Sequence, residues 1–196
     1  MRHGFVKVAA ATPDIRVADV AYNTQKICGL IDETVKEGAK VVAFPELCVT
    51  GYTCGDLFTQ EVLLKEARAA LHKIARHTKG KDALIFVGVP VAVEGKLYNV
   101  AAALNQGKIL GLTTKSFLPN YGEFYEMRQF TEGPSAAREI LFDGEKMPFG
   151  PQLLFVADSM ESLVVSAEIC EDAWSSVPPS IEAAREGAVI IANCSA

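Results

Sequence analysis

Apolar residues recur along the chain in two spacings, one typical of helices and one typical of buried strands. Segments 20–36 and 61–77 place apolar residues on one face at helical spacing, which predicts two amphipathic helices. A shorter helix is expected over 179–186. Apolar runs too short for helices predict strands over 5–11, 40–44, 83–93, 97–104, 109–113, 152–157, 163–169 and 188–193.

The order of these segments predicts the fold class. Helices and strands alternate at both ends of the chain, whereas the middle consists of strands joined by short turns, which favours an α/β layered sandwich with a mixed sheet. Segment 118–151 is long for a connection and rich in glycine, proline and aromatic residues, so we expect a functional loop there. Because the chain ends on an apolar strand, we expect residues 1–196 to be one domain that is truncated at its C-terminus.

Composition and charge narrow the possible partners. Hydrophobic residues make up 49% and charged residues 22%, as in ordinary globular domains. The net charge of -5 argues against nucleic acid as a partner. Lys7 and Pro13 interrupt the first apolar run, which does not resemble a secretory signal, and no stretch approaches the roughly 18 apolar residues of a membrane span. We therefore expect a cytoplasmic protein with no membrane partner.

The cysteines and histidines predict neither a disulfide framework nor a structural zinc site. The five cysteines are scattered and form no C-x-x-C pair. Of the three histidines, His72 and His77 lie on a predicted helix, and His3 is near the chain start. We expect reduced thiols and no bound metal.

Cys170 is the first candidate for chemistry, because it follows the apolar run 163–169 directly. Side chains at strand ends of α/β sheets are where ligands usually bind. The residue could be a nucleophile, or it could be a small core residue, since free cysteine is often buried. A nucleophilic thiol needs a base or a cation beside it, and no histidine is well placed for that role.

Glu46 and Lys115 are the other polar residues at predicted strand ends. Glu46 follows Phe44-Pro45, and burial there would raise its pKa toward that of a general base. Lys115 could stabilise an oxyanion and favour a thiolate. Each could equally be a solvated surface residue, as most glutamates and lysines are. Serine-elbow, Walker A, dinucleotide-binding and H-E-x-x-H motifs do not occur.

Three segments around these residues resemble the signature blocks of the nitrilase (carbon–nitrogen hydrolase) superfamily, in the same order. The neighbouring residues 50–52, 120–126 and 173–174 are most similar to the glutaminase domains of glutamine-dependent NAD synthetases. The three blocks are Phe44-Pro45-Glu46-Leu47, Lys115-Ser116-Phe117-Leu118-Pro119 and Glu168-Ile169-Cys170-Glu171-Asp172.

The resemblance implies a four-layer αββα sandwich and a triad in which Cys170 attacks a carboxamide, Glu46 moves protons and Lys115 stabilises the oxyanion. By matched position, Glu123 would be the additional glutamate beside the lysine. The residues that it implies for substrate binding are Tyr121 and Glu171, which would hold the substrate, and Tyr52 and Trp174, which would line its pocket.

The resemblance also implies the substrate and partners. Glutamine would be hydrolysed without a cofactor, and a synthetase domain using ATP and magnesium would take the ammonia to amidate deamido-NAD. The family suggests a homo-oligomer. That domain, with its S-G-G-x-D-S-type loop, is missing from this sequence. The remainder of the nitrilase domain after residue 196 is missing too, including a loop that in relatives helps clasp the amino-acid end of glutamine, so we expect residues 1–196 to hydrolyse glutamine poorly or not at all. The alternatives are a free-standing nitrilase-family amidase or carbamoylase, and a catalytically inert fragment or binding module.

Overall fold

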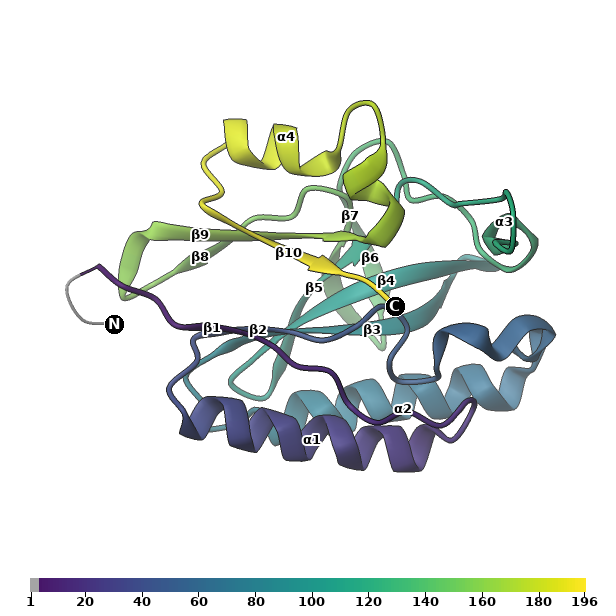
Figure 1. Cartoon of the computed structure of the whole chain (residues 1–196), viewed down its shortest axis with the longest axis horizontal. Helices are drawn as coiled ribbons and strands as arrows, with labels where there is room; N and C mark the ends of the chain where they lie inside the picture. The colour runs from purple at the N-terminus through teal and green to yellow at the C-terminus, as the bar shows by residue number, and fades with distance from the viewer. Residues whose placement is uncertain (1–3) are drawn as a thin grey trace.

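The structure, a computed structural model, describes residues 4–196 and contains two sheets (Figure 1). His3 lies outside the described residues. The larger sheet has seven strands in the order β1-β2-β3-β4-β5-β7-β6, of which β1 to β3 run parallel and β3 to β5 form an antiparallel meander. Its strands are β1 (Val8–Ala10), β2 (Val41–Ala43), β3 (Leu84–Val93), β4 (Lys96–Asn105), β5 (Lys108–Thr114), β6 (Arg138–Phe142) and β7 (Glu145–Gly150).

The smaller sheet has three strands in the order β10-β9-β8. β9 pairs with β10 in parallel and with β8 in antiparallel orientation. The strands are β8 (Phe155–Ala157), β9 (Met160–Ile169) and β10 (Ile190–Cys194).

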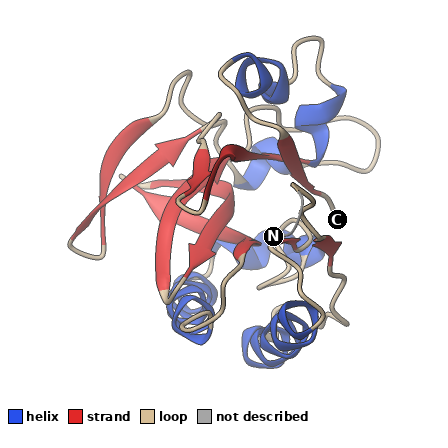
Figure 2. Cartoon of the chain, turned by 90° about the vertical axis from the view of Figure 1, so that its left-hand side faces the viewer, coloured by secondary structure: helices blue, strands red, loops and turns tan. Residues whose placement is uncertain are grey.

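Helices cover the outer faces of both sheets, which confirms the predicted four-layer αββα sandwich. Figures 1 and 2 show α1 and α2 along the large sheet and α4 on the opposite side, over the small sheet. The helices α1 and α2 keep their predicted bounds, and α4 ends one residue early. The helical elements are α1 (Val20–Lys36), η1 (Tyr52–Thr59), α2 (Glu61–His77), α3 (Glu126–Gln129), η2 (Cys170–Trp174) and α4 (Pro179–Arg185).

Two apolar cores explain why the strands were recognisable as continuous apolar runs. Successive side chains of a strand point to opposite faces, so Ile85 and Val87 pack toward the helices while Phe86 packs between the two sheets. The ring of Phe86 meets the ring of Phe155 on β8 edge-on, with centroids 5.6 Å apart. Because both faces of the large sheet are covered, its central strands have no polar side.

The prediction of one functional loop over 118–151 is wrong for its second half. Strands β6 and β7 form a hairpin there, in which Ile140 and Phe142 are buried while Leu141 is 75% exposed. Asp143 and Gly144 both have positive φ, 53° and 83°, at the hairpin turn. Asp-Gly between alternating apolar residues is a strong hairpin signal, and it was present in the sequence. Among residues 4–196, no helix is long and apolar enough to cross a membrane.

Candidate active site

Glu46, Lys115 and Cys170 come together from three strand ends. Lys115 follows β5 directly, Cys170 follows β9 directly, and Glu46 lies in the loop after β2. Lys115 Nζ donates a hydrogen bond to Glu46 Oε1 at 2.7 Å. The pKa of Cys170 is raised, first by burial and then by the charge of Glu46, while Lys115 acts in the opposite direction. The charges of Glu46 and Lys115 therefore act on the thiol in opposite directions.

Lys115 binds a second carboxylate, that of Glu126 at the start of α3. Its Nζ donates to Glu126 Oε1 at 2.6 Å, and the lysine side chain is fully buried. The prediction that Glu123 occupies this position is wrong, because Glu123 is exposed. The main-chain N–H of Glu126 donates to Pro119 O, and this contact at the start of α3 accompanies the inward position of residue 126. Although burial alone would lower the pKa of Lys115, the two carboxylates raise it, so the lysine stays charged.

Asn99 and Tyr52 complete the hydrogen bonding around this ion cluster. Asn99, on β4, donates from Nδ2 to Glu46 Oε1 at 2.6 Å. The hydroxyl of Tyr52 donates to Glu126 Oε1 at 2.7 Å. The sequence interpretation missed Asn99, whose only signal was a polar residue inside the apolar run 97–104.

Two carboxylate oxygens of the cluster remain without partners. Glu46 Oε2 and Glu126 Oε2 are buried and accept no hydrogen bond from the described part of the chain. Burial raises the pKa of Glu46, against the opposing effect of Lys115. A buried carboxylate with one free oxygen and a raised pKa is suited to accept and return a proton.

Asp172 holds the turn that presents Cys170. Cys170 has a φ of 45°, a left-handed conformation that costs a non-glycine residue about 1–3 kcal/mol. The buried carboxylate of Asp172 accepts N–H bonds from Ile169 at 3.0 Å and from Ser116 and Phe117 at 2.9 Å each. Burial raises the pKa of Asp172 to about 6, although these N–H donors oppose the shift. Asp172 thereby joins the cysteine turn to the segment that follows Lys115.

The residues expected to bind substrate occupy different environments. The Tyr121 hydroxyl donates to the Glu171 carboxylate at 2.9 Å, beside Cys170 in the chain. Tyr52 and Glu126 line a cavity of about 420 Å³ together with aromatic residues such as Phe124. Trp174 is 81% exposed, so within the described residues it does not form a closed pocket wall.

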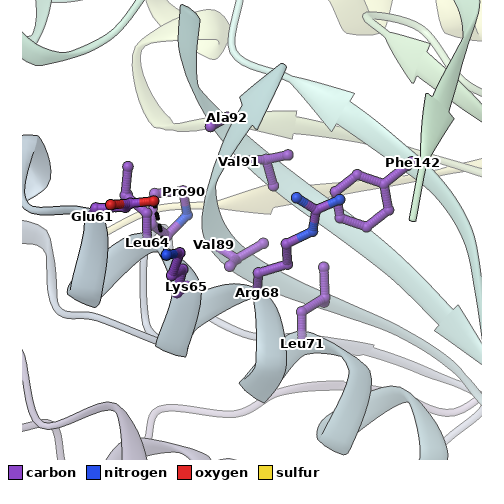
Figure 3. Close-up of a pocket in the computed structure, with 10 residues that line it drawn as sticks. All are labelled: Glu61, Leu64, Lys65, Arg68, Leu71, Val89, Pro90, Val91, Ala92 and Phe142. Atoms are coloured by element: carbon purple, nitrogen blue, oxygen red, sulfur yellow. Dashed lines mark ion pairs between the residues drawn. The ribbon is translucent and has the colours of Figure 1, made fainter. Parts of the chain in front are cut away.

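The two histidines that the structure describes lie outside this site. His72 and His77 bind Asp143 and Asp32, and all five cysteines are free. No group of three metal-ligating side chains occurs within residues 4–196. A separate pocket of about 210 Å³ between α2 and β3 contains Arg68 but none of the triad residues (Figure 3).

Comparison with known proteins places this arrangement in a family. Residues 7–196 match the carbon-nitrogen hydrolase family. The chain is 37% identical over 194 residues to the glutamine-dependent NAD(+) synthetase of Mycobacterium tuberculosis, covering 99% of this chain and 29% of that protein. It is 35% identical over 191 residues to the enzyme of Aquifex aeolicus, covering 97% of this chain and 30% of that protein. The chain thus spans less than a third of the length of these relatives.

Solved structures of two kinds of enzyme are also similar to this chain. The glutamine-dependent NAD(+) synthetase from Cytophaga hutchinsonii superposes with a TM-score of 0.85 at 29% identity, over 97% of this chain and 30% of that one. An amidase from Nesterenkonia superposes with a TM-score of 0.69 at 20% identity, over 98% of this chain and 66% of that one, which is a likeness of fold alone. With the family match extending over nearly its whole length, the chain belongs to the carbon–nitrogen hydrolase family.

Proposed function

We propose that this chain is the glutaminase domain of a glutamine-dependent NAD synthetase, and that within the parent protein it hydrolyses the side-chain amide of glutamine. The observation that carries the proposal is the buried Lys115 between Glu46 and Glu126, beside the strained turn of Cys170. The 37% identity to NAD synthetases supports glutamine as the substrate.

In the first step, Cys170 Sγ attacks the carboxamide carbon and its proton passes to the free oxygen of Glu46. The oxyanion that forms accepts hydrogen bonds from Lys115 Nζ and from the main-chain N–H of Glu171. An ammonium has three donors, and Lys115 uses two on Glu46 and Glu126, which leaves one for the oxyanion. Such donors contribute about 3–4 kcal/mol each to transition-state stabilisation.

In the rest of the reaction, Glu46 gives up a proton twice, first to the departing ammonia and later to the thiolate of Cys170. When the C–N bond breaks, Glu46 protonates the departing ammonia and a thioester to Cys170 remains. Glu46 then removes a proton from water as the water attacks the thioester carbon. The thiolate leaves, takes that proton back, and glutamate is released, so no proton is gained or lost by the enzyme.

Tyr121 and Glu171 are suited to hold the amino-acid end of glutamine. We propose that the Glu171 carboxylate, oriented by the Tyr121 hydroxyl, binds the α-ammonium group. Tyr52, fixed on Glu126, would form a wall of the same pocket, and Trp174 would cover it.

The proposed reaction also determines which cofactors and partners this domain and the parent protein would need. We propose that this domain needs no cofactor, because thiol, carboxylate and ammonium supply the nucleophile, the base and the oxyanion donor. ATP and magnesium would act in the synthetase part, which receives the ammonia. We also propose that the parent protein is cytoplasmic and forms a homo-oligomer.

A free-standing amidase is the second candidate, because the match to the carbon-nitrogen hydrolase family does not itself specify glutamine. A chloroketone analogue of glutamine separates the two candidates. In the full-length gene product it should alkylate Cys170, identified by peptide mass spectrometry, and L-glutamine should protect the residue. Cys170→Ser should remain unlabelled at this peptide. Absence of labelling, or equal protection by acetamide, would contradict a glutamine site.

A further inference from the structure

We propose that Asn99 is a positioning residue, which determines the oxygen of Glu46 that receives the proton of Cys170. The inference rests on the proposed role of Glu46 as the base. It concerns a residue that lies on β4, away from the three signature segments.

The hydrogen bonds of Glu46 are divided unequally between its two oxygens. Oε1 accepts one bond from Asn99 Nδ2 at 2.6 Å and one from Lys115 Nζ at 2.7 Å. Oε2 accepts none from the described residues and is buried. Two donors, one of them cationic, stabilise negative charge on Oε1 and make it the poorer proton acceptor. Oε2 is left as the basic oxygen.

Lys115 alone would not fix this division. The terminal torsion of a glutamate is broad and roughly two-fold, so the carboxylate could exchange its oxygens or share the ammonium between them. The amide of Asn99 removes that freedom, because its N–H bond to Oε1 adds a second donor with a fixed direction. Asn99 is 1% exposed, so water does not compete for this bond.

The orientation of the Asn99 amide follows from the same contact. Reversing the amide would bring Oδ1 against a carboxylate oxygen at 2.6 Å, where two acceptors repel. In the present orientation Oδ1 is buried without a partner in the described part of the chain. An unpaired buried oxygen of this kind costs about 1–3 kcal/mol. The position of Asn99 therefore satisfies the N–H donor of its amide and leaves the oxygen acceptor unpaired.

Asn99 also holds the second member of the triad through its main chain. Its carbonyl oxygen accepts the main-chain N–H of Lys115 at 2.9 Å, where β4 pairs with β5. One residue of β4 therefore fixes the Glu46 side chain and the Lys115 backbone together. A side-chain substitution at Asn99 removes the first contact and leaves the second in place.

The test measures the reactivity of Cys170 toward chloroacetamide between pH 5 and 9 by peptide mass spectrometry. The half-buried Cys28 is the internal control, because it lies on α1 outside the site. Asn99→Leu keeps the branching at Cγ and has no donor, and should slow alkylation of Cys170 by about 10- to 100-fold at every pH. Urea unfolding establishes that the variant is folded.

Asn99→Asp gives the decisive readout. Its introduced carboxyl donates to Glu46 while protonated and repels Glu46 when ionised. Its Cys170 rate relative to wild type should therefore be nearest to one at pH 5 and fall as the pH rises. A ratio that is constant with pH would overturn the proposal, as would a folded Asn99→Leu that reacts like wild type. If Asn99→Leu does not fold, the Asn99→Asp series still decides. Because chloroacetamide is no glutamine analogue, a wrong substrate assignment would affect only the chloroketone experiment.

Discussion

Two clusters of three ionisable side chains in this molecule have nearly the same internal distances and opposite surroundings. In the buried cluster, Lys115 lies 2.7 Å from Glu46 and 2.6 Å from Glu126, with side chains 0–5% exposed. In the surface cluster, Asp143 lies 2.5 Å from His72 and 2.9 Å from Arg68 Nε, with side chains 35–46% exposed. Geometry alone would give the two clusters equal importance.

Solvent exposure separates their roles. Exposed ion pairs contribute about 0–1 kcal/mol, since water screens them and ordering long side chains costs entropy. Arg68 nonetheless contacts the ring of Phe142, as Figure 3 shows, so the surface cluster fastens the β6–β7 hairpin onto α2. In the buried cluster, two carboxylates face one cation and two oxygens have no partner among the described residues. That arrangement costs stability, and the proton transfer proposed for Glu46 would account for it.

Removing the central cation of the buried cluster should have the largest effect. Lys115→Met leaves two buried carboxylates without their counter-ion, and breaking a buried pair in this way costs about 3–5 kcal/mol. Urea unfolding at pH 8 measures this loss. Lys65→Met, on the exposed face of α2, is the matched control and should leave the unfolding midpoint unchanged.

The loss in Lys115→Met should depend on pH in a defined direction. Burial already raises the pKa of Glu46, and removing the ammonium raises it further. A carboxyl with a higher pKa in the folded than in the unfolded protein favours folding at low pH, and this stability is lost as pH rises through the folded pKa. The deficit should therefore shrink from pH 8 to pH 5. A deficit that stays constant would contradict the account.

Replacing one acid of the buried cluster should have the next largest effect. The substitution also tests whether Glu126 or Glu123 is the second acid beside Lys115. Glu126→Gln keeps the shape but loses the charged acceptor of Lys115 and Tyr52, with an expected cost of about 1–3 kcal/mol. The charge of Glu126 also raises the pKa of Glu46. Removing that charge should lower the pKa, so the pH midpoint for alkylation of Cys170 should also be lower in the variant. Glu123→Gln, on an exposed residue, should change neither quantity; equal effects of the two substitutions would refute this assignment.

The grouping of Glu46, Lys115 and Cys170 was predictable because its signal is local. Each member follows an apolar run that ends at a strand terminus, and three such segments in a fixed order resemble a known family. The partners of the triad carry no comparable signal, since they are set by which strands meet in space. Asn99 is 53 residues from Glu46, and Asp172 is 56 residues from Ser116.

The confusion of Glu123 with Glu126 has a similar origin. Both lie in one polar, aromatic segment, and only the first turn of α3 decides which of them points inward. The missed β6–β7 hairpin is a different error, because its alternation and its Asp-Gly turn were visible in the sequence. Sequence patterns therefore predicted the layers and the candidate residues at the strand ends, but not the buried contacts that arrange them.

Breaking the surface cluster should cost far less than breaking the buried one. Asp143→Asn removes pairs that are about one-third exposed, so we expect a loss of at most about 1 kcal/mol at pH 7. Although burial alone would raise it, the bonds from Arg68 and His72 hold the pKa of Asp143 below its ordinary value. Such a group stabilises above its unfolded pKa and loses the contribution as pH falls through its folded pKa. Wild type and variant should converge in acid and in high salt, and a loss comparable with Lys115→Met would remove the distinction between the clusters.

The smallest effect is expected for an ion pair that lies wholly at the surface. Glu61 and Lys65 are one helical turn apart at 2.8 Å, with side chains 81% and 73% exposed. The pair is slightly shorter than the contact between Arg68 Nε and Asp143 at 2.9 Å, yet water surrounds both groups and their ordering opposes the attraction. Glu61→Gln should leave the urea midpoint within measurement error at both low and high salt. A clear shift would mean that distance, and not burial, determines what an ion pair contributes in this protein.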